Sequence, residues 1–257
     1  MMIYDFFFQD MSSAQLMTLL LSAVLIGINK TGMPGIGTLP VVMLALMFPT
    51  KLSTGLQLMM LCAADLMAVS YYRRGANWKL VLRLLPCALC GMGIGSLTLH
   101  LIDDRLLRTA IGVIILFLAL LNWIRNRYIS QEKIPDHAAF VFLVGLTAGF
   151  TTQVANAAGP VMALYLLAMR LPKEEYMGTC AWYFMILNWI KLPLFVAEGR
   201  ITESAFRADL AMLPFLLLGA VLGIVFIRKA PQKLFEWIIQ VLVVISALKL
   251  LFPDHLF

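Results

Sequence analysis

Gly27–Pro40 reads Gly-Ile-Asn-Lys-Thr-Gly-Met-Pro-Gly-Ile-Gly-Thr-Leu-Pro and lies between two apolar runs, Leu16–Ile26 and Val41–Phe48. Each run is too short to cross a bilayer alone, since a spanning helix needs about 20 apolar residues. The glycines and prolines disfavour a regular helix through hydrocarbon. Irregular backbone is tolerated at membrane depth only where protein or a wet cavity surrounds it. The stretch therefore predicts either an ordinary surface loop or an interrupted membrane segment.

A second stretch, Gly145–Pro160, reads Gly-Leu-Thr-Ala-Gly-Phe-Thr-Thr-Gln-Val-Ala-Asn-Ala-Ala-Gly-Pro and also lies between short apolar runs. Later positions of the two halves match as well, with a drift that accumulates where loops are expected. Two halves that each open with an interrupted helix pair are typical of a transporter with a binding site near the membrane midplane. The matched pairs are Pro40 with Pro160, Gly55 with Gly178, Asp65 with Asn188, Pro86 with Pro214, Gly91 with Gly219 and Gly95 with Gly223.

Composition places almost the whole chain in the membrane. Of its 257 residues, 61% are hydrophobic and 13% are charged, and the mean hydropathy is +0.89. A globular domain needs far fewer apolar residues. We therefore expect an all-α, polytopic protein of the plasma (inner) membrane, in contact with the lipid bilayer. The formal net charge of +6 sets orientation in such a protein and does not indicate a nucleic-acid partner.

Five apolar segments are predicted in each half, and the first two of each half are short. An odd number of crossings per half inverts the second copy, so we expect two inverted repeats, 1–128 and 129–257, within a single membrane domain. The loops on one side carry most of the lysines and arginines, and that side is cytoplasmic by the positive-inside rule, which places both termini outside. The segments are about 12–28, 34–48, 54–72, 80–101, 105–124, 138–152, 157–170, 176–196, 205–227 and 232–252.

Lys30 is the first candidate for a substrate site. A lysine at the bilayer centre costs about 2.5–3.5 kcal/mol on insertion scales, so it implies a compensating anion or carboxylate. The alternative is a loop lysine at the cytoplasmic surface. A helix that begins near Pro34 would point its positive end at the same place. Further donors in this tip are Asn29, Thr31 and the backbone amides near Gly32 and Gly35.

The second tip supplies uncharged polar groups. Asn156 is predicted to N-cap the helix through Val161, where free amides can bind an anion; capping without a ligand is the alternative. Each helix end contributes about half a positive charge, and Lys30 adds one more. Neither tip contains an acidic residue, so two converging tips favour an anionic solute. The candidate residues of this tip are Thr151, Thr152, Gln153 and Asn156.

Asp65 lies in the middle of an apolar segment, where a carboxylate is a functional candidate by default. Its counterpart in the second half is Asn188, whose segment also carries Lys191. Asp65 either pairs structurally with one of the lysines or couples transport to protons. Ionised Asp65 would cancel about one positive charge of the tips, and protonation would restore it. Gln57, close to the same helix face, and Lys191 are expected to line the path.

Two further motifs have simpler interpretations. Cys87 and Cys90 have the spacing of a redox or metal pair, but on a helix this spacing also just puts two small residues on one face. No partner cysteine pair or histidine lies nearby, so we expect no metal site, no cofactor and no enzymatic activity. The spacing that recurs at Gly91–Gly95 and Gly219–Gly223 predicts close helix packing without a substrate role.

The recurring pattern extends over nearly the whole chain. It comprises Gly27, Lys30 to Gly35, Pro40, Lys51, Gly55, Asp65, Tyr72 to Arg74, Trp78, Pro86, Gly91 and Gly95, and then Gly145, Gly149, Gly159, Pro160 and Asn188. This pattern resembles the sulfite exporter TauE/SafE family, also called the toluene sulfonate uptake permease family. The resemblance implies a multi-pass plasma-membrane carrier with two related halves. It also implies a substrate among sulfite, thiosulfate, sulfonates such as taurine or sulfoacetate, and other organic anions, with proton-linked transport in some members.

We therefore expect a secondary carrier for a small sulfur-containing or organic anion, with protons as the coupling ion and a homodimer as a candidate assembly. A passive anion channel is the first alternative, but it would need a continuous polar stripe, and the predicted helices show few polar residues away from the tips. A membrane thiol-redox enzyme that uses Cys87 and Cys90 is a second alternative. A purely structural membrane scaffold would leave Lys30 and Asp65 without a purpose.

Overall fold

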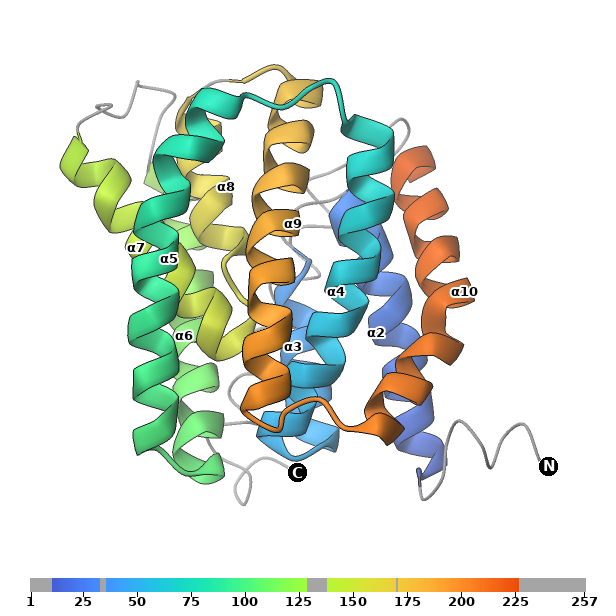
Figure 1. Ribbon diagram of the computed structural model, residues 1–257. Helices are drawn as coiled ribbons and strands as arrows, with labels where there is room; N and C mark the ends of the chain where they lie inside the picture. Colours follow the sequence, from blue (N-terminus) through green and yellow to red (C-terminus); the bar gives the residue numbers. More distant parts are fainter. Residues whose placement is uncertain (1–10, 33–35, 129–137, 170, 227–257) are drawn as a thin grey trace.

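The computed structural model describes residues 11–32, 36–128, 138–169 and 171–226, and this part of the chain is helical without strands (Figure 1). The chain is an all-α, polytopic membrane protein, as predicted: six helices, α2, α4, α5, α7, α9 and α10, are long and apolar enough to cross a bilayer. The predicted segment 232–252 lies outside the described residues. The helices are α2 Ser13–Thr31, α3 Thr38–Met47, α4 Thr50–Tyr72, α5 Trp78–Leu101, α6 Asp104–Tyr128, α7 Ala138–Ala155, α8 Gly159–Ala168, α9 Lys173–Ala197 and α10 Glu203–Phe226.

The first helix of each half is longer than the sequence predicts. α2 continues through Gly27 to Thr31 and has 19 residues, and α7 runs to Ala155 and has 18. The prediction that these two segments are too short to cross is therefore wrong. α3 and α8, with 10 residues each, are as short as expected. Gly27 is not a helix break. It lies within α2 against the backbone of α10, where the missing side chain lets the two helices pack closely.

Glycines pack helices of different halves together. A Cβ at Gly219 of α10 would overlap the Val24 carbonyl of α2, and a Cβ at Gly149 of α7 would overlap the Ala88 carbonyl of α5. Gly91 of α5 lies in the same way against the backbone of α7. The glycine pairs of α5 and α10 therefore serve helix packing, as predicted, because the missing side chains let backbones approach closely.

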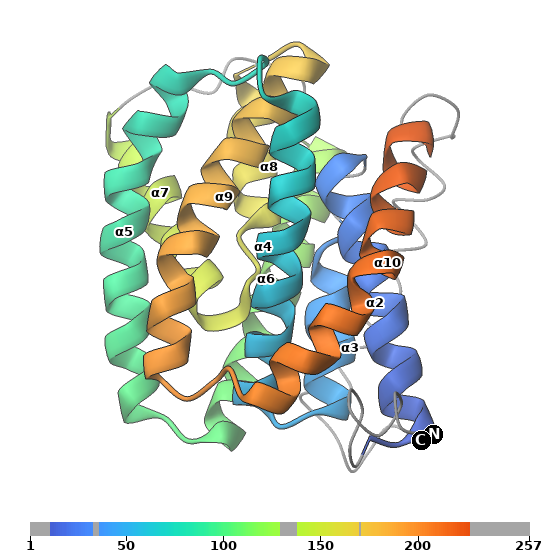
Figure 2. The ribbon, with the colours of Figure 1, turned by 45° about the vertical axis from the view of Figure 1, so that its right-hand side comes forward.

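The two glycine-packed pairs flank a central pair. α4 and α9 pack on each other between α5 and α7 on one side and α2 and α10 on the other (Figures 1 and 2). In Figure 1, α2 begins at the lower end of the molecule and α7 at the upper end. The α2–α3 and α7–α8 pairs thus enter from opposite ends. The end of α2 at Thr31, the start of α3 at Thr38 and the α7–α8 connection at Ala157 and Ala158 are buried. The inverted-repeat relationship of the two halves, each as a unit, stays a prediction.

Large apolar side chains cover the outer helix faces. Such a surface suits a bilayer, because a protein in water rarely exposes contiguous apolar area of this extent. The positive-inside orientation, the plasma-membrane location and the outward termini stay predictions. Examples of these exposed side chains are Met17 on α2, Leu82 and Leu97 on α5, Phe117 on α6, and Leu217 and Val221 on α10.

Candidate functional site

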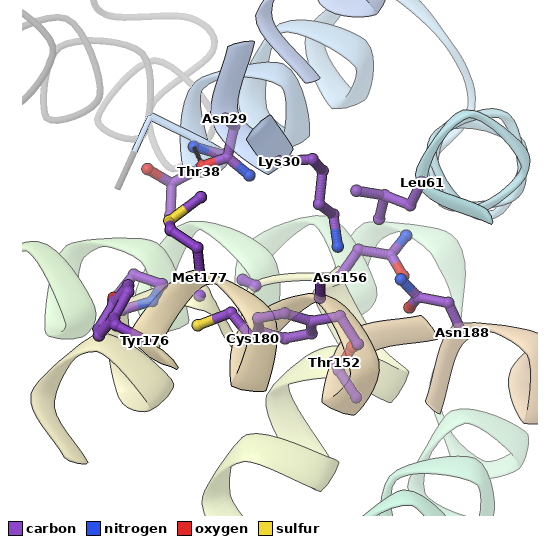
Figure 3. A pocket seen from close by; sticks show the side chains of 16 residues that line it. Asn29, Lys30, Thr38, Leu61, Thr152, Asn156, Tyr176, Met177, Cys180 and Asn188 are labelled. Carbon is purple, nitrogen blue, oxygen red and sulfur yellow. Dashed lines mark hydrogen bonds between the residues drawn. The ribbon is translucent and has the colours of Figure 1, made fainter. Parts of the chain in front are cut away.

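The two tips meet at an interior cavity (Figure 3). Its volume is about 60 Å³, which is roughly four times the space that one water molecule needs by the same measure. Thr38 and Gly159, the first residues of α3 and α8, both border it, so the positive ends of two short helices face the cavity. The predicted site residues in its wall are Asn29, Lys30, Thr152, Asn156 and Asn188.

Lys30 is not a surface-loop lysine, since its side chain is only 8% exposed. Figure 3 shows it pointing from α2 toward Asn156 and Asn188. Its ammonium lies over the Phe184 ring, 4.4 Å from the centroid, in a cation–π contact that offsets part of the cost of burial. The structure therefore brings Lys30 and Asn156, one from each tip, to the same cavity, and their role in substrate binding stays a prediction.

Asp65 is fully buried and binds two residues of the cavity wall. One carboxylate oxygen, Oδ1, lies 2.6 Å from Lys30 Nζ, and the other, Oδ2, accepts a hydrogen bond of 2.6 Å from Asn188 Nδ2. The pairing of Asp65 with Lys30 that the sequence offers as one possibility is therefore present. Removal of one partner from such a buried pair typically costs about 3–5 kcal/mol, because the other charge is left uncompensated.

Lys191 is a second buried cation, and its hydrogen-bond partners are neutral. Its Nζ donates to the Thr152 carbonyl at 3.1 Å, to Thr152 Oγ1 at 2.9 Å and to Asn156 Oδ1 at 2.7 Å. The carbonyl belongs to the last turn of α7, where the negative end of the helix dipole favours a cation. In the described part of the chain no carboxylate pairs with Lys191. With all groups ionised, two lysines face one carboxylate, and the site keeps one positive charge.

Asn156 ends α7 and does not N-cap α8, so that prediction is wrong. Its φ is 51°, in the left-handed region, and its N–H donates to the Thr152 carbonyl at 3.0 Å. Asparagine tolerates this conformation and so terminates helices well. Its Nδ2 donates to the Thr54 carbonyl at 2.9 Å and lies 3.5 Å from Gln57 Oε1. The predicted helix start near Pro34 is also wrong, because α3 begins only at Thr38.

The other predicted residues lie behind or beside the wall. The Thr31 hydroxyl donates to the backbone of α10 at 2.7 Å, and the Thr151 hydroxyl donates within α7 at 2.8 Å. Gln57 and Lys191 are one hydrogen bond behind the wall, through Asn156. Gly35 lies outside the described residues. The tip residues that the structure places outside the cavity wall are Thr31, Gly32, Thr151 and Gln153.

Arg200 is a buried residue that sequence reasoning misses. It lies between α9 and α10, and its side chain is only 2% exposed. Its Nε is 2.7 Å from Glu198 Oε2, and its Nη1 reaches the Gln153 carbonyl at 3.4 Å. Burial lowers the pKa of the Arg200 guanidinium and Glu198 opposes that shift, while an arginine stays charged at neutral pH. Arg200 thus fixes the α7 tip, but no sequence signal separates it from the loop arginines that set orientation.

Cys87 and Cys90 are not part of the cavity wall. Cys87 packs against Gly145, and Cys90 is exposed on α5. Cys180 lines the cavity instead, together with Met177. The four cysteines are free thiols, and the thiol-redox alternative finds no support from the cavity.

Comparison with known proteins gives one match. A family model described as Sulfite exporter TauE/SafE matches residues 19–250. That range contains both tips, Asp65 and the whole of α9. No curated protein and no solved structure matches the chain.

Proposed function

The chain belongs to the sulfite exporter TauE/SafE family, and from that premise we propose that it is a secondary active carrier of a small anion and not an enzyme. One observation carries the proposal: a single cavity takes Lys30 from one tip and Asn156 from the other, with two buried lysines around one carboxylate. The surplus positive charge suits an anion. The candidates are sulfite, thiosulfate and small sulfonates or carboxylates.

The cavity wall offers donors that an oxyanion requires. A lysine ammonium has three N–H groups, so Lys30 keeps donors beyond its contact with Asp65. Two hydroxyl groups also border the cavity, that of Thr38 at the start of α3 and that of Thr152 in the last turn of α7. A volume of about 60 Å³ favours a solute of a few heavy atoms over a large organic anion.

We further propose that Asp65 couples the anion to a proton. While ionised, Asp65 neutralises Lys30 at 2.6 Å. When Asp65 is protonated, the Lys30 ammonium is released to the anion and the site gains one positive charge. Anion and proton therefore bind together, and a proton gradient drives the anion.

Two measurements on the purified chain test this function. A thermal-shift panel of sulfite, thiosulfate, taurine, sulfoacetate, sulfate and small carboxylates should single out one class, because a ligand at about 100 times its Kd stabilises the bound state by about 2.7 kcal/mol. In proteoliposomes, that anion should accumulate under an imposed pH gradient, and a protonophore should abolish the accumulation; a passive channel would only equilibrate it. Undiminished proton-driven uptake by Asp65→Asn would rule out the coupling role.

A further inference from the structure

Asp65 and Asn188 occupy matched positions of the two halves, and their side chains meet. Asn188 Nδ2 donates to Asp65 Oδ2 at 2.6 Å. Asn188 is 1% exposed and forms part of the cavity wall. Its other polar atom, Oδ1, is buried and accepts no hydrogen bond. A buried acceptor without a partner costs about 1–3 kcal/mol, so its presence beside the cavity calls for an explanation.

The carboxyl group of Asp65 can explain the unpaired oxygen of Asn188. An ionised carboxylate only accepts hydrogen bonds, so it holds the NH₂ group of Asn188 toward itself. A protonated carboxyl group also has an O–H donor, and Oδ1 of Asn188 can then accept from it. The oxygen and nitrogen of a carboxamide are nearly equal in size, and the terminal torsion of asparagine is broad and roughly two-fold. The side chain can therefore turn over without repacking.

We propose that the Asn188 carboxamide turns over when Asp65 takes up a proton, and that this turn couples the proton to the anion. This inference rests on the proposed function and deepens it. With Asp65 ionised, the unpaired group of Asn188 is an acceptor, which repels an anion. With Asp65 protonated, the unpaired group is an NH₂ donor, which binds one. The proton comes from water and adds to Asp65 Oδ2; no other covalent bond changes.

The groups around Asp65 are consistent with this exchange. Those that interact electrostatically with it are Lys30 from α2, Lys191 and Cys180 from α9, and Cys62 from α4 itself. α3, which also packs on α4, carries no charged residue, whereas α10, packed on α4 as well, contributes a second buried carboxyl group, that of Asp209. An anion in the cavity competes with Asp65 for the two lysines. Anion binding therefore favours protonated Asp65, and by linkage protonation strengthens anion binding to the same degree.

A purely structural asparagine would behave differently. Its loss would remove a donor to ionised Asp65 and would leave the anion affinity at low pH, where Asp65 is protonated, unchanged. A coupling asparagine donates to the anion in the protonated state, so its loss lowers the low-pH affinity and with it the ratio of the affinities at low and high pH. A hydrogen bond to a charged group is worth about 1.5–3 kcal/mol, so this ratio should fall about tenfold or more without it.

The test measures thiosulfate binding to the full-length purified chain by calorimetry from about pH 5 to about pH 9. Titration of other groups of the site, Lys191 included, contributes alike to the wild type and to both variants, so only the difference between them is interpreted. Asn188→Leu keeps the branched shape at Cγ but has no donor or acceptor, and its low-to-high pH affinity ratio should be at least about tenfold smaller than that of the wild type. Asn29→Leu, the control, removes another cavity-wall amide, one that accepts a hydrogen bond from the Gly37 N–H at 3.0 Å, and should weaken binding with the ratio unchanged. The inference would be overturned if Asn188→Leu kept the wild-type ratio of affinities. It would also be overturned if the ratio fell as much in Asn29→Leu as in Asn188→Leu.

A second measurement uses no ligand and no altered Asn188. Infrared difference spectra of the wild-type chain between high and low pH should show the carboxyl band of Asp65 together with an asparagine amide band, and both should vanish in Asp65→Asn. A carboxyl band without an amide band means that Asn188 does not turn, which overturns the inference. If the wild-type chain binds no thiosulfate while both bands appear, the proposed anion fails but the turn of Asn188 stands.

Discussion

The two lysines of the site have different electrostatic surroundings. Lys30 reaches the cavity directly but is neutralised by Asp65 at 2.6 Å. Lys191 lies behind the wall, yet its hydrogen-bond acceptors are neutral. While Asp65 is ionised, the positive field in the cavity therefore originates from Lys191 and from the N-terminal ends of α3 and α8. Asp65 controls the charge of Lys30, whereas Lys191 acts on the cavity without a carboxylate partner among the described residues.

Substitution of Lys191 should remove its contribution to the positive potential in the cavity. In Lys191→Met a side chain of similar length carries no charge, and a unit charge close to the wall is worth about 2 kcal/mol at an effective dielectric constant near 20. Thiosulfate affinity at about pH 6 should therefore fall roughly thirtyfold, measured by calorimetry. Lys51→Met makes the same chemical change at an exposed residue of α4 and should leave affinity unchanged. Equal affinities in the two variants would show that Lys191 does not act on the anion.

Several site residues could be predicted because burial in hydrocarbon makes polar groups conspicuous. Lys30, Asp65 and Asn188 are such cases, since an ionisable or amide side chain in an apolar segment needs a partner. The role of Asn156 could not be deduced, because asparagine is equally suited to begin one helix or to end the preceding one. Arg200 is hidden among loop arginines, and only the tertiary structure shows its burial.

At the level of elements, the interrupted pairs were recognisable but their boundaries were not. Glycine and proline mark a break, and the second tip is indeed irregular between Ala155 and Gly159, where Asn156 has a positive φ and α8 begins only after it. Gly27, however, is a packing glycine: its neighbours are backbone atoms of α10, which the local sequence does not contain. The same residue type thus has two physical uses, and only tertiary contacts distinguish them.

The start of α8 offers a test of the cavity. A Cβ at Gly159 would meet no atom within 4 Å, and this residue lines the cavity. Gly159→Ala should therefore fold normally, place a methyl group in a space of about 60 Å³ and weaken thiosulfate binding about tenfold, or about 1.4 kcal/mol.

Gly93→Ala is the matched control for this variant. A Cβ at Gly93 also meets no atom within 4 Å, but Gly93 is exposed on α5, outside the cavity wall. Gly93→Ala should leave the thermal stability unchanged or slightly raised, because alanine is the better helix former inside a helix by up to about 1 kcal/mol. Gly159→Ala gains less, since the ring of the following Pro160 restricts the backbone of a residue with a Cβ. Unaltered affinity in Gly159→Ala would mean that the anion binds elsewhere.

Across the whole molecule, both the site and the closest helix contacts involve residues from both halves. α2 of the first half packs on α10 of the second, and α5 of the first packs on α7 of the second. The ion pair and the amide around Asp65 also join α2, α4 and α9. The helices of each half therefore find their closest glycine-lined contacts in the other half.

These contacts between helices of different halves predict that the two halves are stable only together. Residues 1–128 and 129–257, expressed as separate chains, should each be degraded or aggregate, because each exposes glycine-lined helix faces that need the other half. Co-expressed, they should copurify and bind thiosulfate. Gly149→Leu in the second fragment should prevent copurification, since any side chain there overlaps the Ala88 carbonyl, whereas Gly93→Leu in the first should permit it. A monodisperse, thermally cooperative single half in detergent would contradict the interleaved architecture.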